Sequence, residues 1–163
     1  MQLRTVTARM LAALALSIAL VACGGPDFEA VKAYKVFLEE AKPSLAKMNN
    51  VRTELFHVGE PDQMLAKFRD GLLPELERLS KLASDQPTPE TTRLAEIHTT
   101  LKKVLSDYTE ATKKLVEKLG AAKDDRDREA ALVSWGELDQ KFGSDMSKLV
   151  DDLSGYLDSQ MKK

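Results

Sequence analysis

The chain has 163 residues, and 24 Lys and Arg residues nearly balance 26 Asp and Glu residues, which gives a net charge of −2. This balance lacks the strong basic excess of nucleic-acid-binding proteins, so we expect no nucleic-acid partner. A single cysteine, Cys23, excludes a disulfide within the chain. The length predicts one ordinary domain whose stability comes from a packed core.

The first 22 residues have the organisation of a secretory signal peptide. Arg4 and Arg9 form a basic head, and no acidic residue occurs before Cys23. An apolar run, interrupted by one serine, then covers residues 10–21. Such a run rises about 18 Å as a helix, which is less than the roughly 30 Å hydrocarbon core of a bilayer. The pattern therefore favours a cleaved signal over a permanent transmembrane helix.

The end of this segment resembles the lipobox of bacterial lipoproteins. Leu20-Val21-Ala22-Cys23 presents an aliphatic residue, a tolerant position, a small residue and a cysteine in that order. The resemblance implies that the Cys23 thiol receives a diacylglyceryl group, that a signal peptidase cleaves between Ala22 and Cys23, and that Cys23 becomes an acylated N-terminus. The resemblance covers these first residues and carries no information about the rest of the chain. An ordinary secretory signal, with Cys23 as a free thiol, is the alternative.

Lipid on Cys23 would anchor the protein without a transmembrane helix. Two or more acyl chains hold a protein stably at a bilayer, because each buried CH₂ contributes about 0.8 kcal/mol. Residues 23–26 are then the lipidated terminus and a short, non-helical tether. In Gram-negative lipoproteins the family implies that an aspartate after the cysteine retains the protein in the inner membrane. Gly24 at that position favours the outer membrane, facing the periplasm, although a Gram-positive host would remove this inference.

Residues 27–163 are expected to form one helical domain. Removal of residues 1–22 leaves 141 residues with 22 basic and 26 acidic side chains, a net charge of −4. Apolar residues recur at steps of three and four, which places them on one stripe of a helix and averages the 3.5-residue spacing of coiled-coil packing. Four stripes follow this pattern: Val31, Tyr34, Leu38, Ala41, Leu45, Met48 and Leu55; Leu65, Phe68, Leu72, Leu76 and Leu79; Leu94, Ile97, Leu101, Val104, Tyr108, Ala111 and Leu115; and Leu132, Trp135, Leu138, Phe142, Met146, Leu149, Leu153 and Tyr156.

Short connections with helix-breaking residues separate the four expected helices. Because short connections place successive helices side by side in opposite directions, the sequence predicts an all-α, antiparallel up-down four-helix bundle with coiled-coil-like packing. Thr88 is expected to cap the third helix, with Pro89 at its first position, and Asp124 to cap the fourth. The expected helices cover residues 27–57, 61–83, 89–119 and 124–161.

Two prolines fall inside these expected helices. Proline lacks a backbone donor and its ring clashes with the preceding turn, so it kinks or breaks a helix. The apolar stripe stays in phase across Pro43, so we expect a bend there. Since Gly71 shortly precedes Pro74, we expect a true break in the second helix.

No convergent catalytic site is visible, and we expect no enzyme. A hydrolase needs a nucleophile beside an activating base, usually histidine. His57 falls at the end of the first helix, and His98 is expected to be half exposed beside the third stripe. No GxSxG elbow, HExxH site or Gly-rich phosphate loop occurs. The acidic residues around Asp125 and Asp127 are explained by the start of the fourth helix and lack the pattern of an EF-hand calcium loop.

A carrier of haem, a metal or a small apolar ligand is the alternative function, because bundle interiors hold such groups. No C-x-x-C-H motif occurs, which excludes covalent c-type haem, and Glu96 precedes His98 by two residues where the di-iron pattern requires three. Met48 and Met146 lie on core stripes, where methionine commonly serves as filler. We therefore expect no cofactor and no metal site.

Small residues form a second stripe on the fourth helix. Gly136, Gly143, Ser147 and Ser154 follow one another at spacings of 7, 4 and 7. A glycine within a helix costs about 1 kcal/mol relative to alanine. One explanation is that tertiary packing tolerates these weak positions, and the other is a shallow groove that a partner's helix or backbone approaches closely.

Together these features predict a membrane-anchored bacterial lipoprotein of the cell envelope. Its helical domain is expected to act as a non-catalytic interaction or structural module. The expected partners are the membrane, through the lipid anchor on Cys23, and a protein whose identity the sequence does not give.

Overall fold

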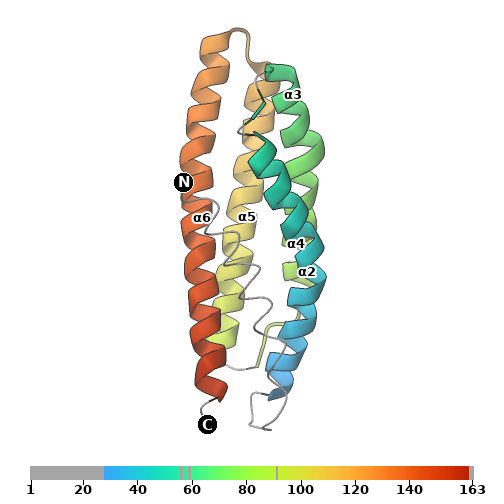
Figure 1. The fold of residues 1–163 in the computed structure, drawn as a ribbon, viewed down its shortest axis with the longest axis vertical. Helices are drawn as coiled ribbons and strands as arrows, with labels where there is room; N and C mark the ends of the chain where they lie inside the picture. The colour runs from blue at the N-terminus through green and yellow to red at the C-terminus, as the bar shows by residue number, and fades with distance from the viewer. Residues whose placement is uncertain (1–27, 56, 59, 91, 162–163) are drawn as a thin grey trace.

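The computed structural model describes residues 28–55, 57–58, 60–90 and 92–161, and these residues contain helices and no β-strand. The all-α prediction is confirmed. Four helices pack against one another (Figure 1), because α3, η2 and α4 follow each other without a gap and form one helix. The predicted signal peptide, lipobox and tether lie outside the described residues. The elements are α2 (Phe28–Leu55), α3 (Pro61–Ala66), the π-helical segment η2 (Lys67–Leu72), α4 (Leu73–Asp85), α5 (Thr92–Ala121) and α6 (Asp125–Met161).

The predicted apolar stripes form the core, since every stripe residue is buried or half-buried. The helices also bury side chains outside those stripes, because a helix inside a bundle buries a wider face than a coiled-coil seam. None of the described helices is long and apolar enough to cross a membrane. The additional buried residues include Phe37, Ser44 and Arg52 on α2; His98, Leu105, Thr109 and Thr112 on α5; and Ala131 and Asp139 on α6.

The helices are packed unevenly. α5 packs closely against α6 and α4, and α2 packs closely against α4 and η2. The backbones of α2 and α6, in contrast, barely approach each other. We call the line along which α2 and α6 face each other the α2–α6 seam. Contact across this seam therefore depends on long side chains.

The second helix is not broken at Pro74, which makes that prediction wrong. Leu72 and Leu73 have helical backbone angles, with φ of −72° and −60° and ψ of −50° and −44°. The N–H of Leu73 donates to the carbonyl of Phe68, five residues earlier, as in a π-helix. This wider turn displaces the carbonyls that would otherwise clash with the proline ring, so the helix continues. α2 likewise continues through Pro43.

The starts of α5 and α6 differ in how well they were predicted. α5 begins at Thr92, so the prediction of a helix that starts at Pro89 with a Thr88 cap is wrong. Residues that precede a proline favour extended conformations, and Gln86, before Pro87, is extended with φ of −66° and ψ of 125°. At α6 the predicted cap is confirmed, because the N–H of Asp127 donates to Oδ1 of Asp124 at 2.9 Å.

Gly71 marks the place where η2 comes close to α2. A Cβ at this position would lie 3.2 and 3.3 Å from the two γ-methyl groups of Val51, which is tighter than ordinary van der Waals contact. Packing therefore explains this glycine, which the sequence analysis attributed to a break. At Gly136 a Cβ would meet no atom within 4 Å.

Replacing Gly136 with alanine is expected to raise the free energy of unfolding by about 1 kcal/mol, since alanine favours the helix and the added methyl meets open space. Gly71→Ala is the matched comparison and should gain less or lose stability, because its methyl presses on Val51. Urea denaturation followed by helical circular dichroism measures both changes. Equal stabilisation by the two substitutions would contradict the close approach of η2 to α2.

Candidate functional site

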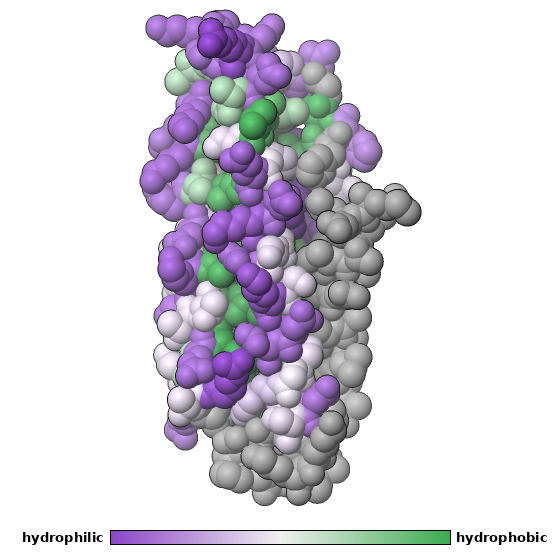
Figure 2. Space-filling model, turned by 90° about the vertical axis from the view of Figure 1, so that its left-hand side faces the viewer, coloured by the Kyte–Doolittle hydropathy of each residue, from purple (hydrophilic) through white to green (hydrophobic). Residues whose placement is uncertain are grey.

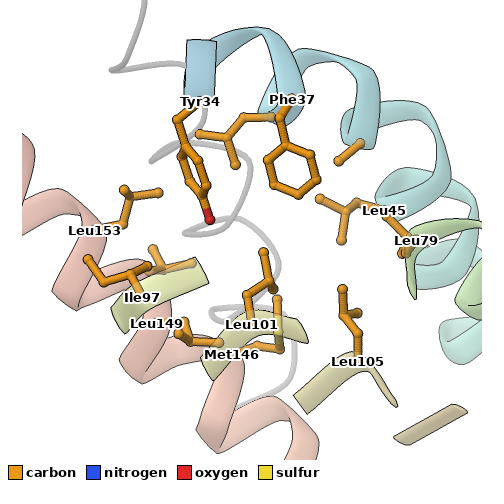
Figure 3. A pocket seen from close by; sticks show the side chains of 13 residues that line it. Tyr34, Phe37, Leu45, Leu79, Ile97, Leu101, Leu105, Met146, Leu149 and Leu153 are labelled. Atoms are coloured by element: carbon orange, nitrogen blue, oxygen red, sulfur yellow. The ribbon is translucent and has the colours of Figure 1, made fainter. Parts of the chain in front are cut away.

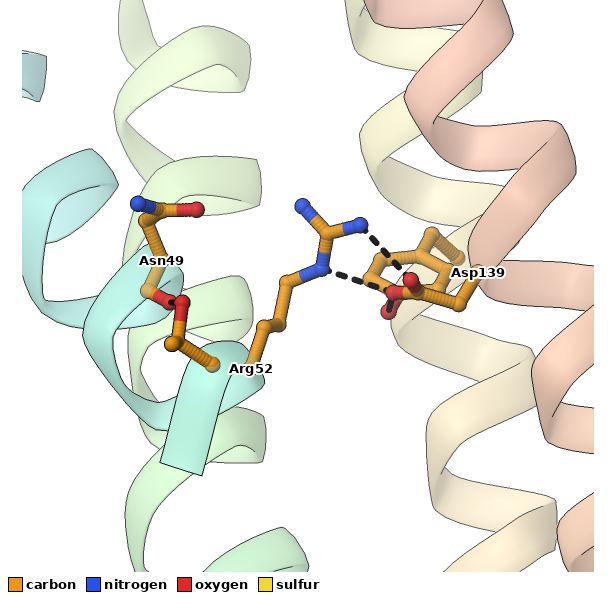
Figure 4. Close-up of polar contacts among 5 residues, drawn as sticks. Asn49, Arg52 and Asp139 are labelled. Carbon is orange, nitrogen blue, oxygen red and sulfur yellow. Dashed lines mark hydrogen bonds and ion pairs between the residues drawn. The ribbon is translucent and has the colours of Figure 1, made fainter. Parts of the chain in front are cut away.

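A buried ion pair joins α2 to α6 across their seam. Nε and Nη2 of Arg52 donate to Oδ1 and Oδ2 of Asp139 at 2.6 and 2.8 Å, a two-pronged geometry (Figure 4). Arg52 is 4% exposed and Asp139 is 3% exposed. The hydroxyl of Tyr108, from α5, donates to the same Oδ1 at 2.7 Å. We call Arg52, Asp139 and Tyr108 the buried polar cluster.

Aromatic rings surround this cluster. The guanidinium carbon of Arg52 lies 5.4 Å from the centroid of the Phe142 ring, within range of a cation–π interaction. Phe142 in turn stacks on Tyr108 with centroids 4.0 Å apart and planes 10° apart. Next to them, Phe68 of η2 meets Trp135 edge-on at 5.0 Å. Each of the four helices thus contributes to the cluster or its walls, and the low-dielectric surroundings strengthen its hydrogen bonds.

Arg52 and Tyr108 of the cluster both keep their protons near neutral pH. Burial alone would lower the pKa of Arg52, but the hydrogen bond to Asp139 and the charge of Asp139 hold this pKa above its ordinary value. Burial, followed by the charge of Asp139, raises the pKa of Tyr108. Neither group loses a proton near neutral pH, which general acid–base catalysis would require. The arrangement is suited to linking helices.

The sequence analysis missed this cluster, although a signal was present. The first stripe takes a seven-residue step from Met48 to Leu55, and Arg52 occupies the skipped position. On α6, Asp139 follows Trp135 by four residues, which places it on the same face. A cation and an anion at core positions of two helices indicate a pair, because a lone buried charge is very costly.

His98 is fully buried, with 0% exposure, so the prediction of a half-exposed side chain is wrong. Tyr34 and Phe37 of α2 cover its ring, with centroids at 5.7 and 5.9 Å in edge-on contacts. Among the described residues, neither ring nitrogen has a hydrogen bond of standard geometry. Burial, followed by the charge of Lys102, lowers the pKa of His98, and backbone carbonyls nearby only partly oppose the shift. His57 lies in an exposed turn that follows α2, two residues after the last helical residue of α2, Leu55.

An apolar cavity of about 70 Å³, the main cavity, lies toward the other end of the bundle, where α2 begins and α6 ends. Figure 3 shows the side chains of all four helices around it, with the hydroxyl of Tyr34 directed inward. Tyr34 and Met146 supply the only side-chain heteroatoms of the lining, and neither histidine belongs to it. The lining consists of Tyr34, Phe37, Leu38, Ala41, Leu45, Leu79, Ile97, Leu101, Leu105, Met146, Leu149, Val150 and Leu153.

A smaller cavity of about 20 Å³, the side cavity, shares part of this lining. Tyr34, Leu38 and Leu153 border both cavities, and Lys35 borders the side cavity alone. The two cavities therefore follow the α2–α6 seam toward the start of α2. Within the described part of the chain, no three or more His, Cys, Asp or Glu side chains gather to hold a metal ion.

The small-residue stripe on α6 lies at the surface. Gly136 is exposed, and Gly143, Ser147 and Ser154 are half-buried. A Cβ on either glycine would meet nothing within 4 Å, so there is open space beside these two glycines. The groove for a partner stays a prediction.

The visible surface gives little further indication of a docking face. The face in Figure 2 is largely hydrophilic, with apolar side chains in a narrow band. Among the described residues, the exposed large apolar side chains are Val36 and Val133, on different helices. Single exposed apolar residues of this kind are ordinary on protein surfaces.

Breaking the buried pair is expected to cost much more stability than replacing it. Arg52→Met alone leaves Asp139 charged and buried, and should lower the free energy of unfolding by about 3–5 kcal/mol. The double variant Arg52→Met with Asp139→Leu should recover most of this loss, because it removes both charges and keeps apolar volume. Lys103→Met, which breaks the exposed Lys103–Asp107 pair, is the control and should cost less than about 1 kcal/mol. Urea denaturation measures all three, and a double variant no more stable than Arg52→Met alone would contradict the coupling.

The domain is expected to lose stability as the pH falls from 7 to 5. Because the pKa of His98 is lower in the folded state than in the unfolded state, the unfolded state binds the proton first. The stabilisation is complete above the unfolded pKa of about 6.5 and declines below it, by at most about 1.4 kcal/mol per pH unit. His98→Leu should flatten this dependence, whereas His57→Gln should leave it intact. Urea denaturation at pH 7 and pH 5 tests both, and equal slopes in the parent and His98→Leu would exclude the histidine as its source.

Comparison with known proteins identified no relative of this chain. No protein-family model matches the chain, and no curated protein matches it. No solved structure matches it either. The two features of the bundle interior, the buried polar cluster and the main cavity, therefore rest on their own geometry.

Proposed function

We propose that this protein is a lipid-anchored lipoprotein of the bacterial cell envelope whose helical domain serves as a non-catalytic interaction or structural module. The observation that carries this proposal is the resemblance of Leu20-Val21-Ala22-Cys23 to a lipobox, after a basic head and a short apolar run. The buried polar cluster supports a structural role, because its hydrogen bonds join α2, α5 and α6 and the Arg52 guanidinium stays charged near neutral pH. Gly24 after the cysteine supports the outer membrane, with the domain facing the periplasm.

The arrangement of the bundle belongs to the same proposal. Successive helices run in alternate directions, as an antiparallel up-down bundle with coiled-coil-like packing. The short connections between α4 and α5 and between α5 and α6 support this arrangement. In Figure 1 the start of α2, in blue, and the end of α6, in red, lie at the same end of the bundle. An anchor on Cys23 would then hold this end nearest to the membrane, since Cys23 precedes α2 by only five residues.

A second candidate function is the binding of a small apolar ligand inside the bundle. The main cavity favours it, because an apolar lining excludes water and rewards the burial of an apolar molecule. The haem and metal versions of this function gain no support from the lining, whose only potential ligand atoms are a phenol oxygen and a thioether sulfur.

Substitution of Cys23 by serine tests the anchor. The parent protein should appear in the membrane fraction and carry an acylated N-terminus at residue 23, as measured by intact mass spectrometry after extraction. Cys23→Ser should keep the uncleaved precursor mass and lose every acyl group, because the thiol that accepts the lipid is missing. Gly25→Ser, two residues further on, is the control and should be processed as the parent is. Normal processing and equal membrane partitioning of Cys23→Ser would refute the proposal.

A further inference from the structure

We propose that the bundle binds a medium- to long-chain monocarboxylate, a fatty acid, with its hydrocarbon tail in the main cavity and its carboxylate at Lys35. The inference rests on the second candidate function and names the chemical class of its ligand. It assigns separate parts of the site to the two ends of the ligand.

The main cavity fits the end of an alkyl chain. Its lining is aliphatic and aromatic and comes from all four helices, so each of the four helices would contact a tail. The Tyr34 hydroxyl is the one side-chain hydrogen-bond donor in this lining, and Tyr34 also borders the side cavity. Polar groups of a ligand are therefore disfavoured inside the main cavity and have to lie at its border.

Lys35 provides a cation at that border. Its side chain is half-buried against the side cavity, and among the described residues no carboxylate pairs with it. The neighbouring lysines of α2 differ, because Lys32 lies 4.0 Å from Glu29 and Lys42 lies 2.6 Å from Glu39. A carboxylate at the mouth of the side cavity would lie beside Lys35, whose ammonium group provides the opposite charge.

The α2–α6 seam provides the way in. The main cavity is about half the volume of an apolar cavity of about 150 Å³ that binds benzene. A longer chain therefore has to part α2 from α6, and this is the side where their backbones barely approach. The Arg52–Asp139 pair holds the two helices together toward the other end. The seam thus opens at the cavities while the bundle stays assembled.

The position of the site suits a ligand taken from a membrane. The described chain begins at Phe28, two turns before Tyr34 and Lys35. Five extended residues span at most about 18 Å, so an anchor on Cys23 keeps the side cavity close to the bilayer surface, where fatty acids reside. A double-chain phospholipid would need space for two tails beside a single lysine. The small volume of the main cavity disfavours it.

Titration with a matched pair of probes, decanoate and decanol, tests the inference. The full-length processed protein, with ¹³C-labelled methyl groups, is held in phosphatidylcholine nanodiscs, and the resonances of Ile97, Leu101 and Leu149 report on the main cavity. Lys35→Met removes the charge, and Lys32→Met is its control on the same helix. Leu101→Phe fills the main cavity, and Leu132→Phe is its control on a half-buried position outside the lining.

Both probes should shift the cavity resonances of the parent. Lys35→Met should lower the affinity for decanoate at least about tenfold, because a charge-assisted hydrogen bond is lost. Its affinity for decanol should not change, and the Lys32→Met control should bind both probes as the parent does. Leu101→Phe should lower the affinity for both probes, and Leu132→Phe should change neither affinity. Decanoate that binds Lys35→Met as it binds the parent would overturn the assignment of the carboxylate while the second candidate function stands. An absence of cavity shifts with either probe would overturn both.

Discussion

The Arg52–Asp139 pair is the constraint on which the bundle geometry depends. Each partner alone inside the core would carry a desolvation penalty of several kcal/mol, so the charges are tolerable only when they meet. Their meeting fixes the rotation and the height of α2 relative to α6, two helices whose backbones barely approach. The Tyr108 hydroxyl donates to the same carboxylate, and this hydrogen bond also sets the position of α5 along α6. One polar contact therefore aligns three helices that apolar packing alone would align less specifically.

The interior is divided between two kinds of interaction. Around Asp139, hydrogen bonds and stacked rings fill the space and exclude other arrangements. Around Ile97 and Leu149, apolar side chains leave a cavity, and dispersion and the hydrophobic effect hold α2 against the other helices, while the exposed Arg93–Asp152 pair joins α5 to α6. The first region is filled by specific contacts, and the second leaves free volume of about 70 Å³.

The sequence was sufficient for the helices and the main positions of the core, because steps of three and four in apolar residues directly reflect helical geometry. The Asp124 cap was predictable for the same reason, since the chemistry of a helix start is local. Pro74 was misjudged because a π-helical turn depends on how η2 packs against Val51, which no local pattern shows. The depth of His98 depends on rings from α2, and the partner of Arg52 lies 87 residues away. The cavities were not predictable, because they arise where side chains of four helices fail to meet.

The unequal interior also implies an unequal response to cold. The hydrophobic effect weakens as the temperature falls, because the burial of apolar surface changes the heat capacity. The region around the cavities relies on that effect, whereas a charge pair and its hydrogen bonds hold the region around Arg52. On cooling, the start of α2 and the end of α6 should therefore separate first. Low temperature would thus loosen the end of the bundle that holds the cavities before it loosens the end that holds the buried polar cluster.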